Sequence, residues 1–346
     1  MSNKQKAAAI GGGVLVLAVG AFFLLKGGGI DSLPIIGKDD PITCPLTGLE
    51  PKDEAIVERA AVAIKIENAA VARPLSGLES ADVVYEELVE GGETRFMAIF
   101  HCGDTKKGGP VRSARIVDPS LLVPFTRILG FSGANQPVLD ALAEADIVAL
   151  TETVAEDAME RVPREGISSE HTLYANSAKL RKAAADDYSD PPPADMFTFG
   201  DLEGTRGKKA SMITLNFGGA STITYDYSDG SWNRSQDGVP FVSEAGGQIA
   251  PANVIVEEHT VNFSDTIIDS AGNPSIEIED DTGSGNAVLF RDGRAIVGTW
   301  VRESADAPVR FETKSGDQMV FAPGSVWIEL VPSDVGEVKG SFSYEK

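Results

Sequence analysis

The fold of this chain is decided by two neighbouring stretches, residues 91–102 (GGETRFMAIFHC) and residues 109–115 (GPVRSAR). The first reads as a buried strand, since its apolar run is typical of a central position in a sheet. The second reads as a Gly-Pro turn followed by a short run that carries Arg112 and Arg115. Arg95 begins the strand, so three arginines gather here in a chain of net charge −22. We expect this stretch to bring arginines to the rim of a sheet.

Length and composition indicate a folded protein of two domains. The chain has 346 residues, and 42% of them are hydrophobic, which is enough to bury sizeable cores. Lys and Arg number 30 against 52 Asp and Glu. Because so acidic a chain repels phosphates, we expect no nucleic-acid partner. The acidity is better explained by solubility than by an acidic surface made for a basic partner.

The N-terminus predicts a membrane anchor. Residues 7–25 carry no charge, with Lys4 and Lys6 before them and Lys26 after them. A helix over this run is ~28 Å long, which matches a bilayer core. The lysines in front predict a cytoplasmic tail over 1–6, a single transmembrane signal anchor over 7–26 and a linker over 27–43. A cleaved secretory signal is the alternative, and both place the bulk of the chain outside the cytoplasm at the cell membrane.

The two cysteines, Cys44 and Cys102, have two interpretations. Export to an oxidising compartment favours a disulfide between them. Such a bond would pin the start of the folded region to the end of the strand in residues 91–102. Two unrelated free thiols are the alternative.

The first folded segment, residues 44–190, alternates strands with short helices. Strands are expected at 61–66, 82–88 and 95–102, from their apolar or alternating patterns. Helical spacing predicts helices at 136–145 and 176–185. We therefore predict an α/β domain that contains a mixed sheet with short helices.

The second segment begins after the sharpest break in the chain, Asp190 and three prolines. Because prolines interrupt both helices and central strands, we place a Pro-rich linker at 191–207. A mostly antiparallel β domain is expected over 208–332, with a tail at 333–346. Asp292-Gly293 lies between two apolar strands and predicts a type I′ hairpin turn.

Both segments contain short motifs that are specific in their order and spacing. They are CPLTGL (44–49), ARPLSGL (72–78), ADVVYE (81–86), GGETRF (91–96), GPVRSAR (109–115), GSGNA (283–287), FRDG (290–293), GTW (298–300) and PGSVWI (323–328). This set resembles the bacterial YerB-like lipoprotein family, over about residues 44–332. The resemblance implies an extracytoplasmic protein of two parts with unassigned function and no established catalytic residues. The chain departs from the family at its N-terminus, where an apolar span replaces a lipidated cysteine, and around His171, where it reads SEHTLY.

The arginines predict a binding cleft for an anionic or polar ligand. Arg112 and Arg115 are three residues apart, so one helical turn would put both on one face. Guanidinium groups suit carboxylate or phosphate. Other polar residues lie at the ends of predicted strands or the starts of helices, where α/β sheets form a crevice. The predicted ligand-binding residues are Asn68, Glu86, Arg95, Arg112, Arg115, His171 and Tyr174. The competing interpretation is an internal network in which the arginines pair with Glu86, Glu90 and Glu93.

The leading functional hypothesis is a membrane-tethered, non-catalytic binding or scaffolding protein of the cell envelope. Its partners would be the membrane, through the N-terminal helix, and a cell-wall component or envelope protein. The alternative is a cell-wall hydrolase that uses Glu86 or Glu87 with His171 as an acid–base pair. The three histidines lack metal-binding spacing, so we expect neither a metal nor a cofactor.

Overall fold

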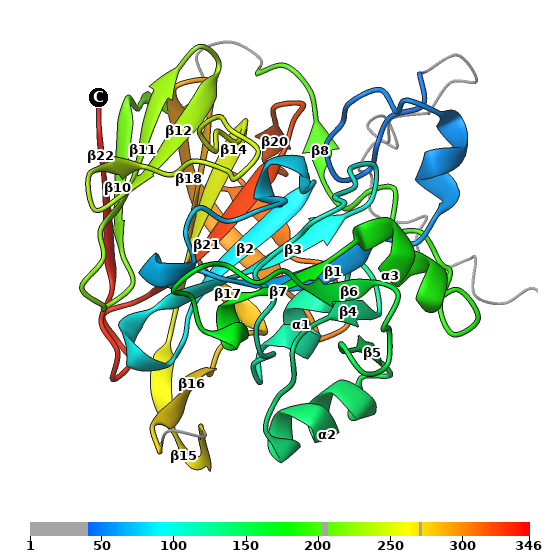
Figure 1. Ribbon diagram of the computed structural model, residues 1–346. Helices are drawn as coiled ribbons and strands as arrows, with labels where there is room; N and C mark the ends of the chain where they lie inside the picture. Colours follow the sequence, from blue (N-terminus) through cyan, green and yellow to red (C-terminus); the bar gives the residue numbers. More distant parts are fainter. Residues whose placement is uncertain (1–40, 203–206, 270–271) are drawn as a thin grey trace, which may run out of the picture. The chain divides into compact units, whose positions relative to one another are not determined.

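Three neighbouring strands form the middle of the main sheet in the computed structural model, which describes residues 41–202, 207–269 and 272–346 (Figure 1). They are β1 (Val62–Glu67), β2 (Val83–Leu88) and β3 (Thr94–Phe100). Strand β3 lies between the other two and pairs antiparallel with both. All three confirm strands expected from the sequence.

The main sheet extends on both sides of these strands and is mixed, as predicted. On one side, β4 (Ile128–Gly130) pairs parallel with β1, and β5 (Val148–Leu150) pairs parallel with β4. On the other side, β21 pairs parallel with β2 and with β14. The remaining strands follow in the order β14, β17, β18 and β19, and β9 also pairs with β18. Their bounds are β9 Lys208–Lys209, β14 Asn253–His259, β17 Gly283–Arg291, β18 Arg294–Arg302, β19 Arg310–Thr313 and β21 Val326–Pro332.

Strand β21 joins the two predicted domains into one sheet. It comes from the segment predicted as a separate β domain, yet it pairs with β2 of the segment predicted as α/β. The prolines at 191–193 therefore do not divide the chain into two separate folded domains, and Ile42–Lys346 forms one compact unit. All seven residues of β21 are buried, which is typical of a parallel strand covered on both faces.

A second sheet has five strands in the order β13, β12, β11, β10 and β22. Strand β22 lies within residues 333–346, which the sequence predicted as a tail, and it pairs with β10. The bounds are β10 Met212–Asn216, β11 Ile223–Ser228, β12 Ser231–Gln236, β13 Val239–Pro240 and β22 Ser341–Glu345. Three strand pairs complete the β structure: β15 Val261–Ile268 with β16 Pro274–Ile278, β20 Val320–Phe321 with β8 Thr198–Phe199, and β6 Met159–Arg161 with β7 Leu173–Ala175.

The described chain is mostly β, with few helices. Both predicted helices are present, as α2 (Gln136–Glu144) and α3 (Ser177–Ala183), and α1 (Asp118–Leu122) is a short third. The short 3-10 helices are Glu54–Glu58, Ala70–Ala72, Leu78–Ser80, Glu90–Gly92 and Ser169–His171. The predicted transmembrane segment at 7–26 lies outside the described residues. Within them, no helix combines the length and the apolar character needed to span a bilayer.

The main sheet separates two hydrophobic cores. Alternate residues of each strand point to opposite faces, so Ile64 joins one core and Ala63 the other. The second sheet covers the first face, where Trp232 and Tyr225 pack into the core. Helices α1 and α2 belong to the core of the second face. Polar side chains on the two faces of one strand therefore enter different surroundings.

A fully buried ion pair links the two sheets through the first core. Nη2 of Arg234, on β12, lies 3.0 and 2.9 Å from the two carboxylate oxygens of Glu86, on β2. The rings of Phe241 and Phe96 lie near the guanidinium, at 4.1 and 5.4 Å from their centroids. Burial and the Glu86 charge raise the pKa of Glu329 well above its usual range, so Arg234 faces one carboxylate anion.

Two local predictions are also confirmed. Cys44 and Cys102 form a disulfide across 58 residues of sequence. Asp292 and Gly293 both have positive φ, 49° and 64°, and they connect β17 to β18 as the hairpin turn.

We predict that removing the disulfide destabilises the protein by about 4 kcal/mol, because the unfolded chain regains the entropy of the open loop. The variant is Cys44→Ser with Cys102→Ser, and the measurement is the free energy of unfolding in urea. Either single substitution should give the same value as the pair. A reductant should lower the free energy of unfolding of the parent to that value and leave the variants unchanged. An unchanged free energy of unfolding for the parent in reductant would contradict the prediction.

We predict that Arg234→Met lowers the free energy of unfolding by about 3–5 kcal/mol, because it leaves the Glu86 carboxylate buried without a partner. Chemical denaturation measures the loss. Arg161→Met is the matched control, since Arg161 pairs with Glu152 with exposed fractions of 39% and 38% and should cost under about 1 kcal/mol. Adding Glu86→Gln to Arg234→Met should recover part of the loss. Equal costs for Arg234→Met and Arg161→Met would refute this role.

Candidate functional site

The predicted turn at 109–115 lies where the parallel strands β1 and β4 end. The backbone N–H of Arg112 donates to the carbonyl of Lys65 at 2.9 Å, next to a bridge between Ile66 and Val111. On the other side, the N–H of Ser132, just after β4, donates to the carbonyl of Arg112 at 3.0 Å. The carboxyl ends of parallel strands commonly form the crevice of such a sheet. The turn therefore places its arginines at that edge.

The structure brings the three predicted arginines together, and we call Arg95, Arg112 and Arg115 the arginine cluster. Nη1 of Arg95 donates to the carbonyl of Ser113, between the other two, at 3.1 Å. Burial, together with the charges of Arg115 and Arg112, lowers the pKa of Arg95 to about 10. Within the described part of the chain, Arg95 has no ion pair with a carboxylate, although Glu67 and Glu87 lie opposite it on β1 and β2. Its guanidinium is thus an incompletely partnered cation.

Arg115 instead has its own carboxylate. Its Nε donates to Oε2 of Glu90 at 2.8 Å, and its Nη2 contacts the same oxygen. The side chains of Arg115 and Glu90 are 13% and 5% exposed. This pair matches the internal network that the sequence left open for the arginines. The network interpretation therefore applies to Arg115.

Arg112 and His171 share the Glu67 carboxylate. Nδ1 of His171 lies 2.7 Å from Oε2 of Glu67, and Nε of Arg112 lies 3.9 Å from the same oxygen. Glu170 is a second, exposed partner, at 3.7 Å from Arg112 and 3.5 Å from His171. Burial raises the pKa of Glu67, while the hydrogen bond from His171 opposes that rise. His171 therefore lies next to the cluster and is linked to Arg112 through Glu67.

A buried triad beneath the cluster was missed by sequence reasoning. Nζ of Lys65 lies 2.6 Å from Asp118 and contacts Glu87, and all three side chains are at most 2% exposed. The second Asp118 oxygen accepts from the backbone N–H of Arg115 at 2.7 Å, so the triad holds the turn. Burial raises the pKa of Glu87 to about 7. The available signal was Lys65 itself, a single charge inside the apolar strand AVAIKI.

Two predicted site residues, Asn68 and Glu86, lie elsewhere. Glu86 points to the face opposite Glu87 and pairs with Arg234. Nδ2 of Asn68 donates to Glu86 at 3.3 Å and to Thr94 at 2.7 Å. Both residues are at most 1% exposed. The correction has a simple cause, because neighbouring residues of a strand face opposite ways and the sequence does not say which face carries the arginine cluster.

Tyr174 is also separate from the cluster. It is 2% exposed, and Nζ of Lys107 lies 4.3 Å from the centre of its ring. No contact among the described residues joins its hydroxyl to the arginines. The predicted hydrolase pair is likewise not assembled, since the carboxylate beside His171 is Glu67 and neither Glu86 nor Glu87.

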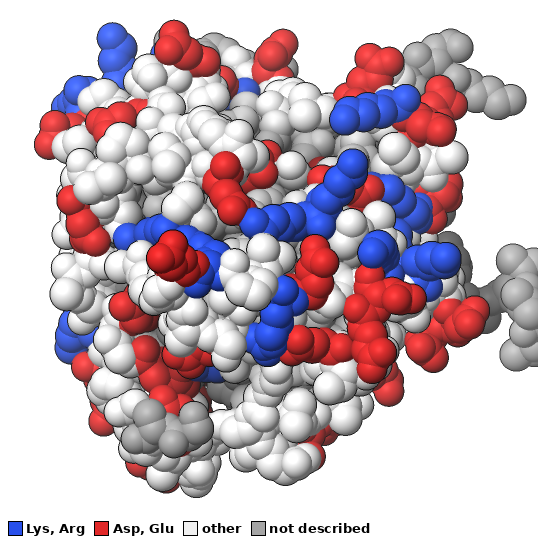
Figure 2. Space-filling view, in the orientation of Figure 1, with Lys and Arg blue, Asp and Glu red and all other residues white. Residues whose placement is uncertain are grey.

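The charges around the cluster show what the arrangement can do chemically. On the face drawn in Figure 2, Lys and Arg side chains gather across the middle and are interleaved with Asp and Glu. Among the described residues Arg95 has no ion pair, and its single hydrogen bond goes to a carbonyl. Residues 41–202, 207–269 and 272–346 contain no group of three or more His, Cys, Asp or Glu that could hold a metal ion. The remaining guanidinium donors of Arg95 are the groups here that could contact an anion.

Comparisons with known proteins match most of the chain. Residues 46–190 match the N-terminal domain, and residues 213–328 the C-terminal domain, of "Protein of unknown function (DUF3048)". The chain is 29% identical over 318 residues to "Putative lipoprotein YerB" of Bacillus subtilis (strain 168), covering 87% of this chain and 89% of that protein. The crystal structure of YerB from Bacillus subtilis superposes with a TM-score of 0.69 at 27% identity, covering 87% of this chain and 99% of that one. This chain therefore belongs to the YerB-like DUF3048 family.

Proposed function

We propose that this protein binds an anionic ligand at the arginine cluster in the cell envelope, without catalysing a reaction. The observation that carries the proposal is Arg95, whose only hydrogen bond among the described residues goes to the carbonyl of Ser113. A guanidinium has five N–H donors in a fork that matches carboxylate or phosphate. A ligand anion would supply the acceptors that the protein does not.

The carboxylates opposite Arg95 do not supply them. Glu67 is engaged with His171, and burial raises its pKa. Glu87 is engaged with Lys65, and burial raises its pKa to about 7. A carboxyl group with a pKa of about 7, such as that of Glu87, carries only part of a negative charge at neutral pH. The charge available to balance Arg95 is therefore reduced, which favours an anion from outside.

The ligand would also carry hydrogen-bond donors. Oε1 of Glu67 and Oε1 of Glu90 are buried and have no hydrogen-bond partner among the residues that the structure describes. A buried acceptor without a partner is costly, so hydroxyl or ammonium groups would be favoured beside the anion. A wall component that combines a carboxylate with sugar hydroxyls has this chemistry.

Two observations support the envelope location. The relative from Bacillus subtilis carries the name lipoprotein, which is a membrane-attached class. This chain has the uncharged run at 7–25, which predicts attachment by a transmembrane helix. In this protein the domain that binds the ligand would stand outside the membrane, next to the wall.

We predict that the full chain in detergent binds purified muropeptides, measured by isothermal titration calorimetry. Arg95→Met should weaken binding about tenfold or more, because charge-assisted hydrogen bonds contribute roughly 1.5–3 kcal/mol. Raising the salt concentration should weaken binding of the parent more than binding of the variant.

Arg161→Met is the control, since it removes an exposed arginine that is paired with Glu152. Its affinity should equal that of the parent. Unchanged affinity in Arg95→Met would refute the site. Release of cleavage products from the muropeptides would refute the non-catalytic role.

A further inference from the structure

The outer edge of strand β18 has a gap in its pairing. Strand β9 pairs with Arg294 and Ala295, and β19 pairs with Gly298 to Val301. Among residues 41–202, 207–269 and 272–346, no strand pairs with Ile296 or Val297 on this edge. On the opposite edge both residues pair with β17.

The register shows which backbone groups face the gap. The backbone N–H of Thr313 donates to the carbonyl of Asp317, and the carbonyl of Phe311 accepts from the N–H of Met319. The backbone groups of Phe311 and Thr313 on β19 therefore point away from β18. Glu312 therefore faces β18, where it lies opposite Thr299. Because backbone groups alternate between the two edges of a strand, Val297 faces the same side as Thr299. The gap thus presents the N–H and C=O of Val297 without a strand partner.

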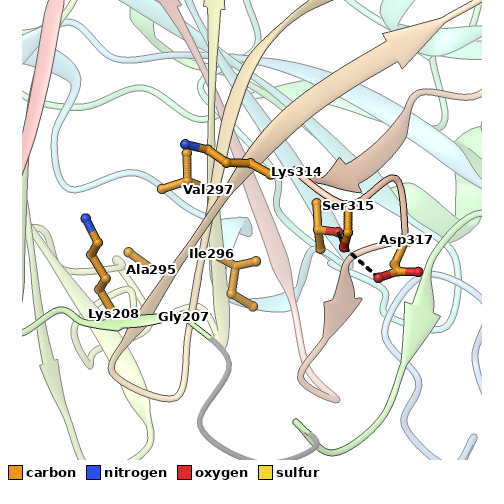
Figure 3. A pocket seen from close by; sticks show the side chains of 9 residues that line it. Gly207, Lys208, Ala295, Ile296, Val297, Lys314, Ser315 and Asp317 are labelled. Atoms are coloured by element: carbon orange, nitrogen blue, oxygen red, sulfur yellow. Dashed lines mark hydrogen bonds between the residues drawn. The ribbon is translucent and has the colours of Figure 1, made fainter.

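This gap opens into a cavity of about 690 Å³, which is within the size range of ligand sites (Figure 3). Its floor is apolar, from Ala295, Ile296 and Val297. Lys208 and Lys314 contribute exposed ammonium groups, and no ion pair among the described residues involves either of them. One carboxylate, Asp317, also lines the cavity and accepts a hydrogen bond from Ser315 at 2.7 Å. Two lysines against one carboxylate favour an anionic occupant.

The ends of the cavity limit the shape of the occupant. The gap is two residues long, about 7 Å of strand, with Lys208 of β9 at one end and the turn after Thr313 at the other. A long strand cannot run through it without displacing β9 or β19. A chain end can enter, pair with Val297 and stop.

We propose that this cavity binds the free carboxyl end of an extended peptide or protein tail. The last residues would add a short strand through the N–H and C=O of Val297, and the terminal carboxylate would contact Lys208 or Lys314. Its apolar floor would accept a small apolar side chain. This surface is independent of the arginine cluster, which lies at the ends of β1 and β4.

The test uses the immobilised full chain and two pools of random pentapeptides, one with free carboxyl ends and one with amidated ends. Mass spectrometry measures the peptides retained. The free-acid pool should be retained about tenfold more than the amide pool, because only the former provides the charge-assisted contacts. Equal retention of the pools, or no retention above a blank surface, would overturn the proposal.

The variant Lys208→Glu with Lys314→Glu should abolish retention of the free-acid pool. Lys209→Glu with Lys106→Glu is the matched control, since these exposed lysines do not line the cavity and the change in charge is the same. All four positions are exposed, so unchanged thermal melts should show that the fold is intact. Retention by the first variant equal to the control would also overturn the proposal, whereas Arg95→Met should have no effect on it.

Discussion

The buried pair of Arg234 and Glu86 is the contact on which the arrangement of the two sheets depends. A charge taken out of water must meet a partner, so β12 can cover β2 only in the position that joins these side chains. Arg234 comes from the segment that matches the C-terminal family domain, and Glu86 from the segment that matches the N-terminal one. The pair, with the pairing of β21 and β2, explains why two family domains form one compact unit.

The sequence predicted the local features of the fold because their signals are local. Alternation and apolar runs identified β1, β2 and β3, and Asp292-Gly293 identified a hairpin. The pairing of β21 with β2 links residues more than 200 positions apart, and no local pattern specifies it. The proline run interrupts the secondary structure along the chain, but strands before and after it still pair in one sheet.

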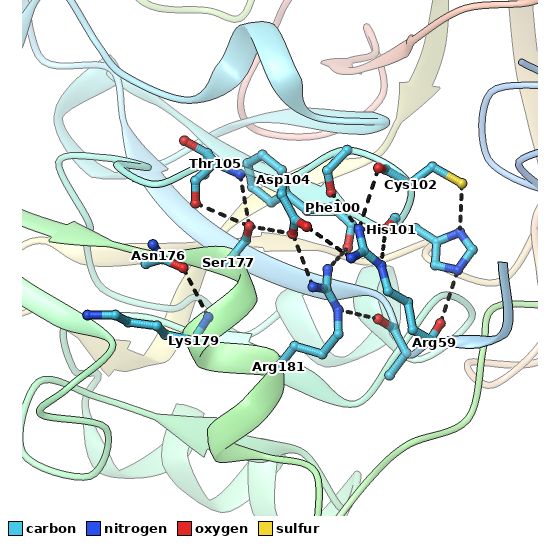
Figure 4. Close-up of polar contacts among 12 residues, drawn as sticks. Arg59, Phe100, His101, Cys102, Asp104, Thr105, Asn176, Ser177, Lys179 and Arg181 are labelled. Atoms are coloured by element: carbon cyan, nitrogen blue, oxygen red, sulfur yellow. Dashed lines mark hydrogen bonds and ion pairs between the residues drawn. The ribbon is translucent and has the colours of Figure 1, made fainter. Parts of the chain in front are cut away.

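The disulfide shows the same division between what was predicted and what was missed. The disulfide could be predicted from two cysteines and an export signal. The side-chain contacts near the disulfide could not be predicted from the sequence. The guanidiniums of Arg59 and Arg181 both contact Asp104, at 3.0 Å each (Figure 4). Arg59 also donates to the carbonyl of His101 at 2.7 Å, and Arg181 to that of Phe100 at 3.3 Å. These partners are far apart in sequence. Every residue has a backbone carbonyl, so the sequence does not indicate which carbonyls accept hydrogen bonds from the arginines.

Arg95 differs from Arg59 and Arg181 in the number of hydrogen-bond acceptors that its guanidinium contacts. Arg59 and Arg181 each have an ion pair and further hydrogen bonds to carbonyls, as expected for guanidiniums that stabilise a fold. Arg95 lies among other cations, with one carbonyl for five donors. Glu90 and Glu87 offset the cost of burying this cation only in part, because burial and the neighbouring arginines still lower the pKa of Arg95. The proposed binding role accounts for the remaining cost, because an anionic ligand would bring further acceptors.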